Sequence, residues 1–286
     1  MGPKPRQTIP RPVAASSSAA VPAVGVGGGT VRVRRWVYKR ASLVLLLLLQ
    51  GGCLVLGFVL LTEPCLNAQY KNSLWDKRNY LSLLARDDVG KERFLAAGVK
   101  SLFGTLVIQA WFTARLNAYT QGATHHHQQL VEGLKGDKEK VRVEFQVPSF
   151  IRQLEAVSAS LLLSLPLTAL AIYALLLVGG ASLTSHWKES ATLATHLALL
   201  LLPPIHIAAP NPGFVQKLLA ANPSPSFLWP LFYPPLFSIA TTLLATATLA
   251  LDSDSPWQTY PFPLIVAGIA GIAVGNVYTI ALILFT

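Results

Sequence analysis

Charge is scarce in this sequence. Charged side chains make up 13% of the 286 residues and hydrophobic ones 52%, and the mean hydropathy is +0.48. A chain this apolar is unsuited to a water-soluble domain and predicts several membrane-spanning segments. The formal net charge of +10 does not indicate nucleic-acid binding, because the lysines and arginines fall mostly in the N-terminal tail and the first two loops. That placement is typical of topology signals and of contact with anionic membrane lipids.

Cysteine and acidic residues are also sparse. Cys53 and Cys65 have neither the number nor the spacing of a disulfide framework or a metal site. From residue 156 to the end, the charged side chains are Lys188, Glu189, Lys217, Asp252 and Asp254. So few groups able to exchange protons or hold a metal predict a protein without catalytic residues, metal or cofactor of its own.

Long apolar runs predict an all-α membrane protein, a bundle of about six transmembrane helices, because each run approaches the roughly 20 residues that cross a bilayer. The runs cover residues 41–62, 96–119, 156–179, 190–209, 227–250 and 262–285. Residues 1–40 are basic and rich in Pro, Ala, Ser and Gly, a composition expected to be disordered. The predicted parts are therefore the tail 1–40, two spans with a polar loop in 41–119, a hydrophilic loop 120–155 and a four-span core 156–286.

The distribution of basic residues predicts the topology. The tail and the loop 120–155 are dense in lysine and arginine, which favours the cytosolic side for both. The polar loop after the first span is then lumenal. With six spans both termini are cytosolic, and the connection between the last two spans lies on the opposite, lumenal face.

That last connection holds the densest group of candidate functional residues. It contains Asp252, Asp254, Pro256, Trp257, Gln258, Tyr260 and Pro261. A carboxylate inside hydrocarbon costs roughly 2.5–3.5 kcal/mol on insertion scales, so the two aspartates predict a turn at the bilayer surface. The aromatic rings favour the same boundary, and the prolines prevent either helix from running through. The segment is expected to be an interfacial hairpin.

Small residues follow the hairpin in the last span. Gly268, Gly271 and Gly275 allow another helix to approach closely enough for dispersion contacts. We expect this face to pack helix on helix, either within the chain or against a partner protein.

Histidines offer a weaker signal for a metal site. The triplet His125 to His127 is expected in a solvated loop, because adjacent side chains point in different directions and nothing placed nearby completes a site. His186, His196 and His206 recur every ten residues, but ten helical steps rotate by about 280°, so the three do not share a face. We interpret them as polar packing residues.

Two other functional classes stay open. A membrane-embedded lipid or glycolipid transferase could use Asp252 and Asp254, which resemble the metal-binding Asp-x-Asp of many glycosyltransferases, although no second acidic cluster supports it. A multi-spanning transporter could use helices broken at prolines 203–204 and 234–235. Transport ranks second, because the halves show no visible self-similarity and the charged residues of the predicted spans, Lys100 and Arg115, lie near the ends of one span.

Two stretches resemble the Pig-F family of glycosylphosphatidylinositol (GPI) anchor biosynthesis. The first is the loop 180–186, which includes His186, with the following span 192–200, which includes His196. The second is 251–258 with Tyr260, Pro261 and the three glycines. Family members usually have tryptophan where this chain has Ser253, and a charged residue in place of Ser255. The resemblance covers about the C-terminal half.

The resemblance implies a six-span protein of the endoplasmic reticulum membrane that is not itself an enzyme. Pig-F proteins bind and stabilise large multi-spanning ethanolamine phosphate transferases, which modify mannoses of the GPI precursor. The implied partners are such a transferase and membrane lipids, with no nucleic acid and no cofactor. The hairpin residues, the glycines and the two histidines would form the partner motif.

Overall fold

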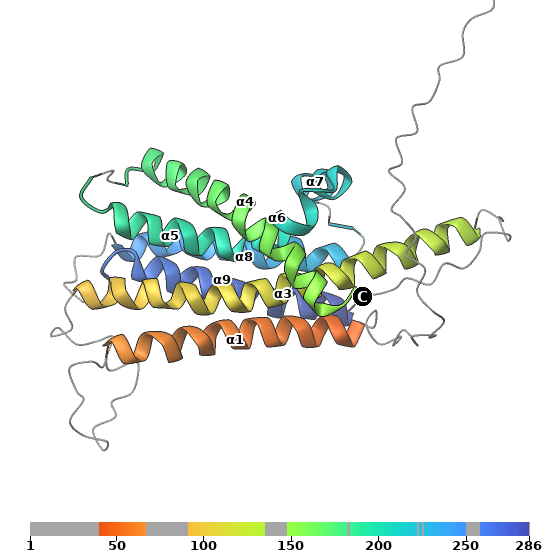
Figure 1. Ribbon diagram of the computed structural model, residues 1–286, viewed down its shortest axis with the longest axis horizontal. Coiled ribbons are helices and arrows are strands. Elements are labelled where there is room, and N and C mark those ends of the chain that lie inside the picture. Colours follow the sequence, from red (N-terminus) through yellow and green to blue (C-terminus); the bar gives the residue numbers. More distant parts are fainter. Residues whose placement is uncertain are drawn as a thin grey trace, which may run out of the picture. The chain divides into compact units, whose positions relative to one another are not determined.

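The computed structural model describes residues 40–66, 91–134, 148–181, 184–221, 223–224, 226–249 and 258–285. Within them the ordered elements are helices (Figure 1). They are α1 (Arg40–Leu66), α3 (Lys91–Leu134), α4 (Phe150–Val178), α5 (Trp187–Leu200), α6 (Leu202–Ala208), α7 (Pro212–Leu219), the 3-10 turn η2 (Ser226–Leu228), α8 (Trp229–Leu249) and α9 (Phe262–Phe285). The predicted all-α membrane fold is confirmed.

Five helices in the described part of the chain are long and apolar enough to cross a membrane: α1, α3, α4, α8 with η2, and α9. The predicted fourth span, 190–209, is not straight, because α5 and α6 meet at an angle of 50°. Pro203 and Pro204 open α6, and since proline has no amide hydrogen the ladder of α5 cannot continue through them. Counting the bent pair as one crossing gives six.

The loop predicted at 120–155 is wrong in its first part. Helix α3 continues to Leu134, because residues 120–134 contain no proline and their polarity is compatible with a helix that has left the membrane. Helix α4 begins at Phe150, earlier than the predicted 156. The polar loop predicted at 63–93 is helical at both ends, because α1 runs to Leu66 and α3 begins at Lys91. The rest of that loop, residues 1–39 of the tail and residues 135–147 lie outside the described residues.

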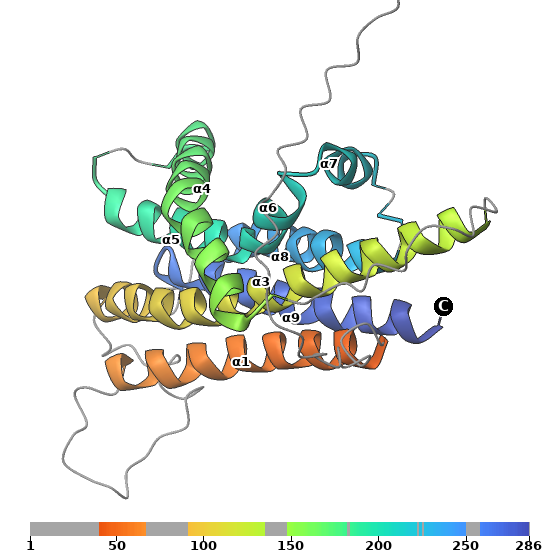
Figure 2. The same cartoon turned by 45° about the vertical axis from the view of Figure 1, so that its right-hand side comes forward.

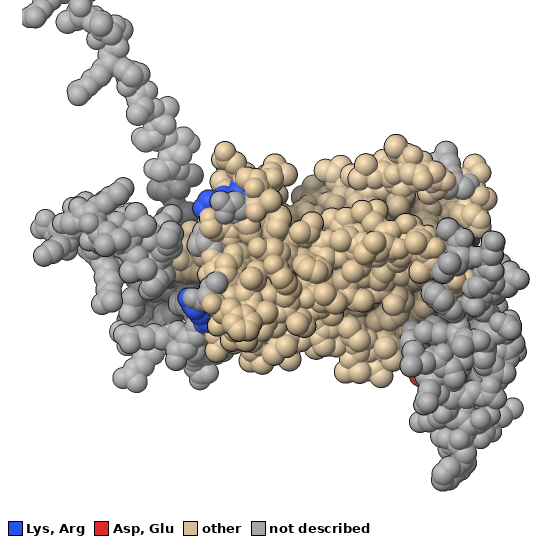
Figure 3. All heavy atoms as spheres, turned by 180° about the vertical axis from the view of Figure 1, so that it is seen from behind, with Lys and Arg blue, Asp and Glu red and all other residues tan. Residues whose placement is uncertain are grey.

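Helix α9 contacts α1, α8 and α5, while α3 contacts α1, α4, α5 and α6. The start of α1 and the end of α9 lie at the same end of the bundle (Figure 1), as an even number of crossings requires. The end of α8 and the start of α9 lie at the opposite end (Figure 1). Among the described residues on the face drawn in Figure 3, Lys, Arg, Asp and Glu lie at the two ends, and the uncharged band between them suits a hydrocarbon layer.

Three buried amide side chains join three helices across the bundle. Gln50 of α1 donates through Nε2 to Oε1 of Gln109 in α3, at 3.0 Å. Asn276 of α9 donates through Nδ2 to Oε1 of Gln50 and to the Leu47 carbonyl, both at 3.0 Å. Unpaired amides are costly in a bilayer, so these contacts fix the register of the three helices.

Breaking this network tests its contribution to the fold. Gln50→Leu leaves the amides of Gln109 and Asn276 without their shared partner, and should lower the free energy of unfolding by about 1–2 kcal/mol. Thermal unfolding of the purified protein in detergent measures the effect. Gln216→Leu makes the same change at an exposed site of α7 and serves as control. Equal melting temperatures for the two variants would contradict the role given to the amides.

Candidate functional site

The three glycines predicted to form a close contact do so against neighbouring helices of the same chain. A Cβ added at Gly271 would lie 2.6 Å from Cα of Ser238, and one at Gly275 would lie 2.5 Å from Cα of Pro234. Both distances are impossible for real atoms, so α8 and α9 touch backbone to backbone at these two positions. A Cβ at Gly268 would meet side chains, at 3.2 Å from both Leu200 of α5 and Thr242 of α8.

Hydroxyl groups of α8 reinforce this contact. Ser238 donates to the Gly268 carbonyl at 2.9 Å, and Thr241 donates to the Ala267 carbonyl at 2.8 Å. The close approach that glycine permits is what brings these hydroxyls within reach of the α9 backbone. Of the two alternatives left open by the sequence, the structure supports packing within the chain. The glycine face is covered and is not a docking surface for another protein.

The last residues of the predicted hairpin attach the start of α9 to the bundle. Tyr260 donates its hydroxyl to Oγ of Ser190, in the first turn of α5, at 3.0 Å. Burial raises the pKa of the Tyr260 phenol, and the hydrogen bond with Ser190 opposes that shift. The carbonyl of Pro261 accepts from the amides of Leu264 and Ile265, at 3.1 Å each. This end of the hairpin is therefore held by defined contacts.

An aromatic cluster lies directly beneath the turn. Phe262 is 2% exposed, and its ring centroid lies 5.0 Å from that of Phe94 in α3 and 5.8 Å from that of Phe58 in α1. The pair with Phe94 is edge-to-face, an arrangement that is favourable beyond the area it buries, and the pair with Phe58 is tilted. Tyr260 packs against the same cluster. Tyr260 and Phe262 together thus attach the start of α9 to α5, α3 and α1.

The acidic part of the hairpin lies outside the described residues. This applies to Asp252, Asp254, Pro256 and Trp257, so the predicted place of the two carboxylates at the bilayer surface stays a prediction. Gln258 is the first described residue after them and is partly buried. Among the residues that the structure describes, no three His, Cys, Asp or Glu side chains gather in a group that could hold a metal ion.

The histidines occupy three separate environments. His196 is buried in α5, and its Nε2 lies 2.8 Å from Oγ of Ser101 and 3.2 Å from the Gly98 carbonyl in α3. A carbonyl only accepts, so Nε2 carries the proton and donates. His206 of α6 accepts through Nε2 from the Asn117 amide at 3.2 Å and lies 2.6 Å through Nδ1 from the Ser160 hydroxyl. Both contacts join helices, as polar packing residues do.

His186 differs from the other two because it is exposed. Its Nδ1 lies 3.8 Å from a carboxylate oxygen of Glu189, three residues along the chain, and 63% of the His186 side chain is accessible. An ion pair of this exposure contributes little to stability. The structure does not bring His186 to His196, and neither joins the glycines in a single site. The candidate residues are thus distributed along the helix contacts.

The sequence did not predict the contacts made by Ser101, Ser160, Ser190 and Ser238. Ser101, Ser160 and Ser238 each bond a group on another helix, and Ser190 bonds Tyr260 in the turn before α9. Serine is common within membrane helices and often bonds its own backbone, as Ser164 does with Ser160. The sequence could indicate only that such a serine lies on a helix face expected to contact another helix. No local pattern identifies the helix that supplies its partner.

Residues 91–280 match the family model described as GPI biosynthesis protein family Pig-F. The match covers more than half of the chain. This chain belongs to the Pig-F family. No curated protein and no solved structure gives a match. The Pig-F match begins at α3 and therefore extends further toward the N-terminus than the predicted C-terminal half. Membership places this membrane protein in GPI-anchor biosynthesis.

Within this Pig-F family member the matched region holds both walls of the glycine contact and the Tyr260–Ser190 bond. Helix α1 precedes the match, yet it supplies Gln50 and Phe58 to the bundle core. The matched helices and α1 thus form one packed unit. The geometry provides close helix packing.

Glycine substitution tests the α8–α9 contact in this Pig-F protein. Gly271→Ala adds a Cβ that overlaps Ser238 and Thr241, so the helices must separate, and stability should fall by about 1–3 kcal/mol. Gly52→Ala is the matched control, because nothing lies within 4 Å of the added Cβ there. Its stability should stay unchanged or rise slightly, since alanine favours helix over glycine. Thermal unfolding in detergent distinguishes the two; a stable Gly271→Ala protein would contradict the close contact.

Proposed function

We propose that the chain is a non-catalytic stabilising subunit of an ethanolamine phosphate transferase in the endoplasmic reticulum membrane. The transferase would modify mannose of the GPI-anchor precursor, and this chain would cross the membrane several times beside it. Membership in the Pig-F family supports the pathway. The described contacts support the subunit role, because glycine, hydroxyl and amide groups serve there to pack helices against one another.

The exposure of helix α4 is the observation that supports a partner protein. None of its spanning window is buried within the chain, whereas 33–44% of the window is buried in each of the other four long spans. Leucines that face away from the bundle include Leu163 and Leu170, at 78% and 64% exposure. Helix α4 also leans away from its neighbours (Figure 2). The exposed face of α4 could therefore pack against a helix of a partner protein.

The glycine face contributes to this function indirectly. Helices α8 and α5 cover it, so it stabilises the subunit and leaves α4 to face the transferase. Van der Waals packing drives helix association in a bilayer, because lipid tails are as apolar as leucine. Substitutions that change the shape of α4 should therefore weaken the complex even when they preserve its hydrophobicity.

The experiment is co-purification of the transferase with tagged variants of this chain. Leu163→Trp with Leu170→Trp alters one face of α4 at a spacing of seven residues, and should reduce recovery of the transferase by about ten-fold, or roughly 1.4 kcal/mol. Leu49→Trp with Leu56→Trp places the same change at the same spacing on exposed leucines of α1 and should leave recovery unchanged. Surface display of a GPI-anchored reporter should follow the recovery.

Three results would contradict the proposal. One is recovery of the transferase with the α4 variant at the level of the α1 control. Another is turnover of a phospholipid or GPI precursor by the purified chain without a partner, abolished by Asp252→Asn, which would indicate a membrane-embedded transferase. The third is substrate transport by the purified chain in vesicles.

A further inference from the structure

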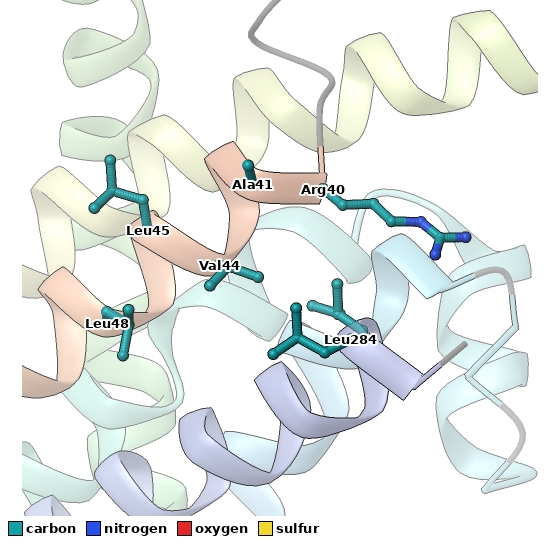
Figure 4. A pocket seen from close by; sticks show the side chains of 7 residues that line it. Arg40, Ala41, Val44, Leu45, Leu48 and Leu284 are labelled. Atoms are coloured by element: carbon teal, nitrogen blue, oxygen red, sulfur yellow. The ribbon is translucent and has the colours of Figure 1, made fainter.

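An apolar groove opens on the membrane side of the bundle, between the start of α1 and the end of α9 (Figure 4). Its volume is about 450 Å³, and it is lined by Arg40, Ala41, Val44, Leu45, Leu48, Ile283 and Leu284. Both walls lie outside residues 91–280, the part of the chain that matches the Pig-F family model. The groove is therefore a feature of this chain beyond the shared region.

The groove has the dimensions and chemistry of an acyl-chain site. Leu45 and Leu48 are 57% and 53% exposed, and Leu284 on the facing wall is 70% exposed. The rise of an α-helix carries the α1 wall about 12 Å from Arg40 to Leu48. One leaflet of a bilayer has a hydrocarbon depth of roughly 15 Å. A lipid tail that lies along this wall therefore stays in contact with it over most of the leaflet.

The mouth of the groove is positively charged. Arg40 is the first residue of α1, and among the described residues it is the one charged side chain that lines the groove. Its side chain extends from the start of α1 in the direction away from Leu45 and Leu48 (Figure 4). No acidic side chain of the described residues lines the groove to neutralise it. The basic end of the chain is expected on the cytosolic side, where the leaflet is rich in anionic lipid.

We propose that this groove binds one anionic phospholipid of the cytosolic leaflet. Its phosphate lies at Arg40, and one acyl chain lies between Leu45 and Leu48 of α1 and Leu284 of α9. The lipid bridges the two helices where the chain enters and leaves the described bundle. This site is distinct from the α4 surface and does not depend on the transferase.

Lipid binding to the purified full-length chain tests the proposal. The protein is placed in nanodiscs of phosphatidylcholine alone or with phosphatidylserine, and native mass spectrometry counts the lipids retained after release. The wild type should retain one phosphatidylserine in preference to phosphatidylcholine. Arg40→Gln removes the charge and should weaken this retention by about five-fold. Leu48→Trp fills the groove and should weaken retention of either lipid there.

Two matched controls separate the groove from general lipid contact. Arg152→Gln removes an exposed arginine at the start of α4, and Leu49→Trp changes the neighbouring leucine, which does not line the groove. Both should retain phosphatidylserine as the wild type does. Circular dichroism checks that each variant is folded. If Arg40→Gln does not fold, the comparison of Leu48→Trp with Leu49→Trp tests the proposal.

Each opposite result overturns the proposal. If the wild type retains phosphatidylcholine and phosphatidylserine equally, Arg40 does not select an anionic lipid. If folded Leu48→Trp retains as much lipid as the wild type, the lipid does not bind in the groove. A wild type that retains no lipid indicates that another occupant, such as the chain's own N-terminal segment, fills the site.

Discussion

The backbone contact between α8 and α9 is the constraint on which the rest of this structure depends. Gly271 and Gly275 lie one turn apart, and at each the α8 backbone takes the space that a side chain would occupy. The helices are then close enough for Ser238 and Thr241 to bond α9 carbonyls. Helix α8 packs on one side of α9, and α1 and α5 contact its other sides. The glycines thus place α9 at the centre of the bundle.

Polar contacts then determine how the other helices surround α9. Asn276 follows Gly275 directly and points to α1, where it meets Gln50. Gln50 in turn reaches Gln109 in α3, and His196 joins α3 to α5. Hydrogen bonds specify partners in a way that leucine contacts cannot, because lipid tails compete with leucine for the same surfaces. The few buried polar side chains therefore determine which helices are neighbours.

The sequence predicted the spans well where hydropathy and length agree, and α9 runs over the predicted residues 262–285. The prediction was wrong at the end of α3, because a polar helix outside the membrane has the composition of a loop. It also missed the bend between α5 and α6, because prolines there were consistent with a span boundary as well. The glycines predicted a close contact but did not identify α8 as the partner. Gln50 and its two partners lie 59 and 226 residues apart in sequence, so no local pattern pairs them.

The proposed subunit role follows from the contrast between α9 and α4. Helix α9 contributes stability because 44% of its spanning window is buried, whereas α4 contacts α3, α5 and α6 and has none of its spanning window buried. If α4 were needed mainly for the stability of this chain, burial of its apolar side chains would be expected. The two larger core clusters contain no buried residue of α4, so the exposed face of α4 can change its contacts without loss of these clusters. In the proposed complex, that freedom allows the subunit to remain folded alone and still present an apolar helix to the transferase.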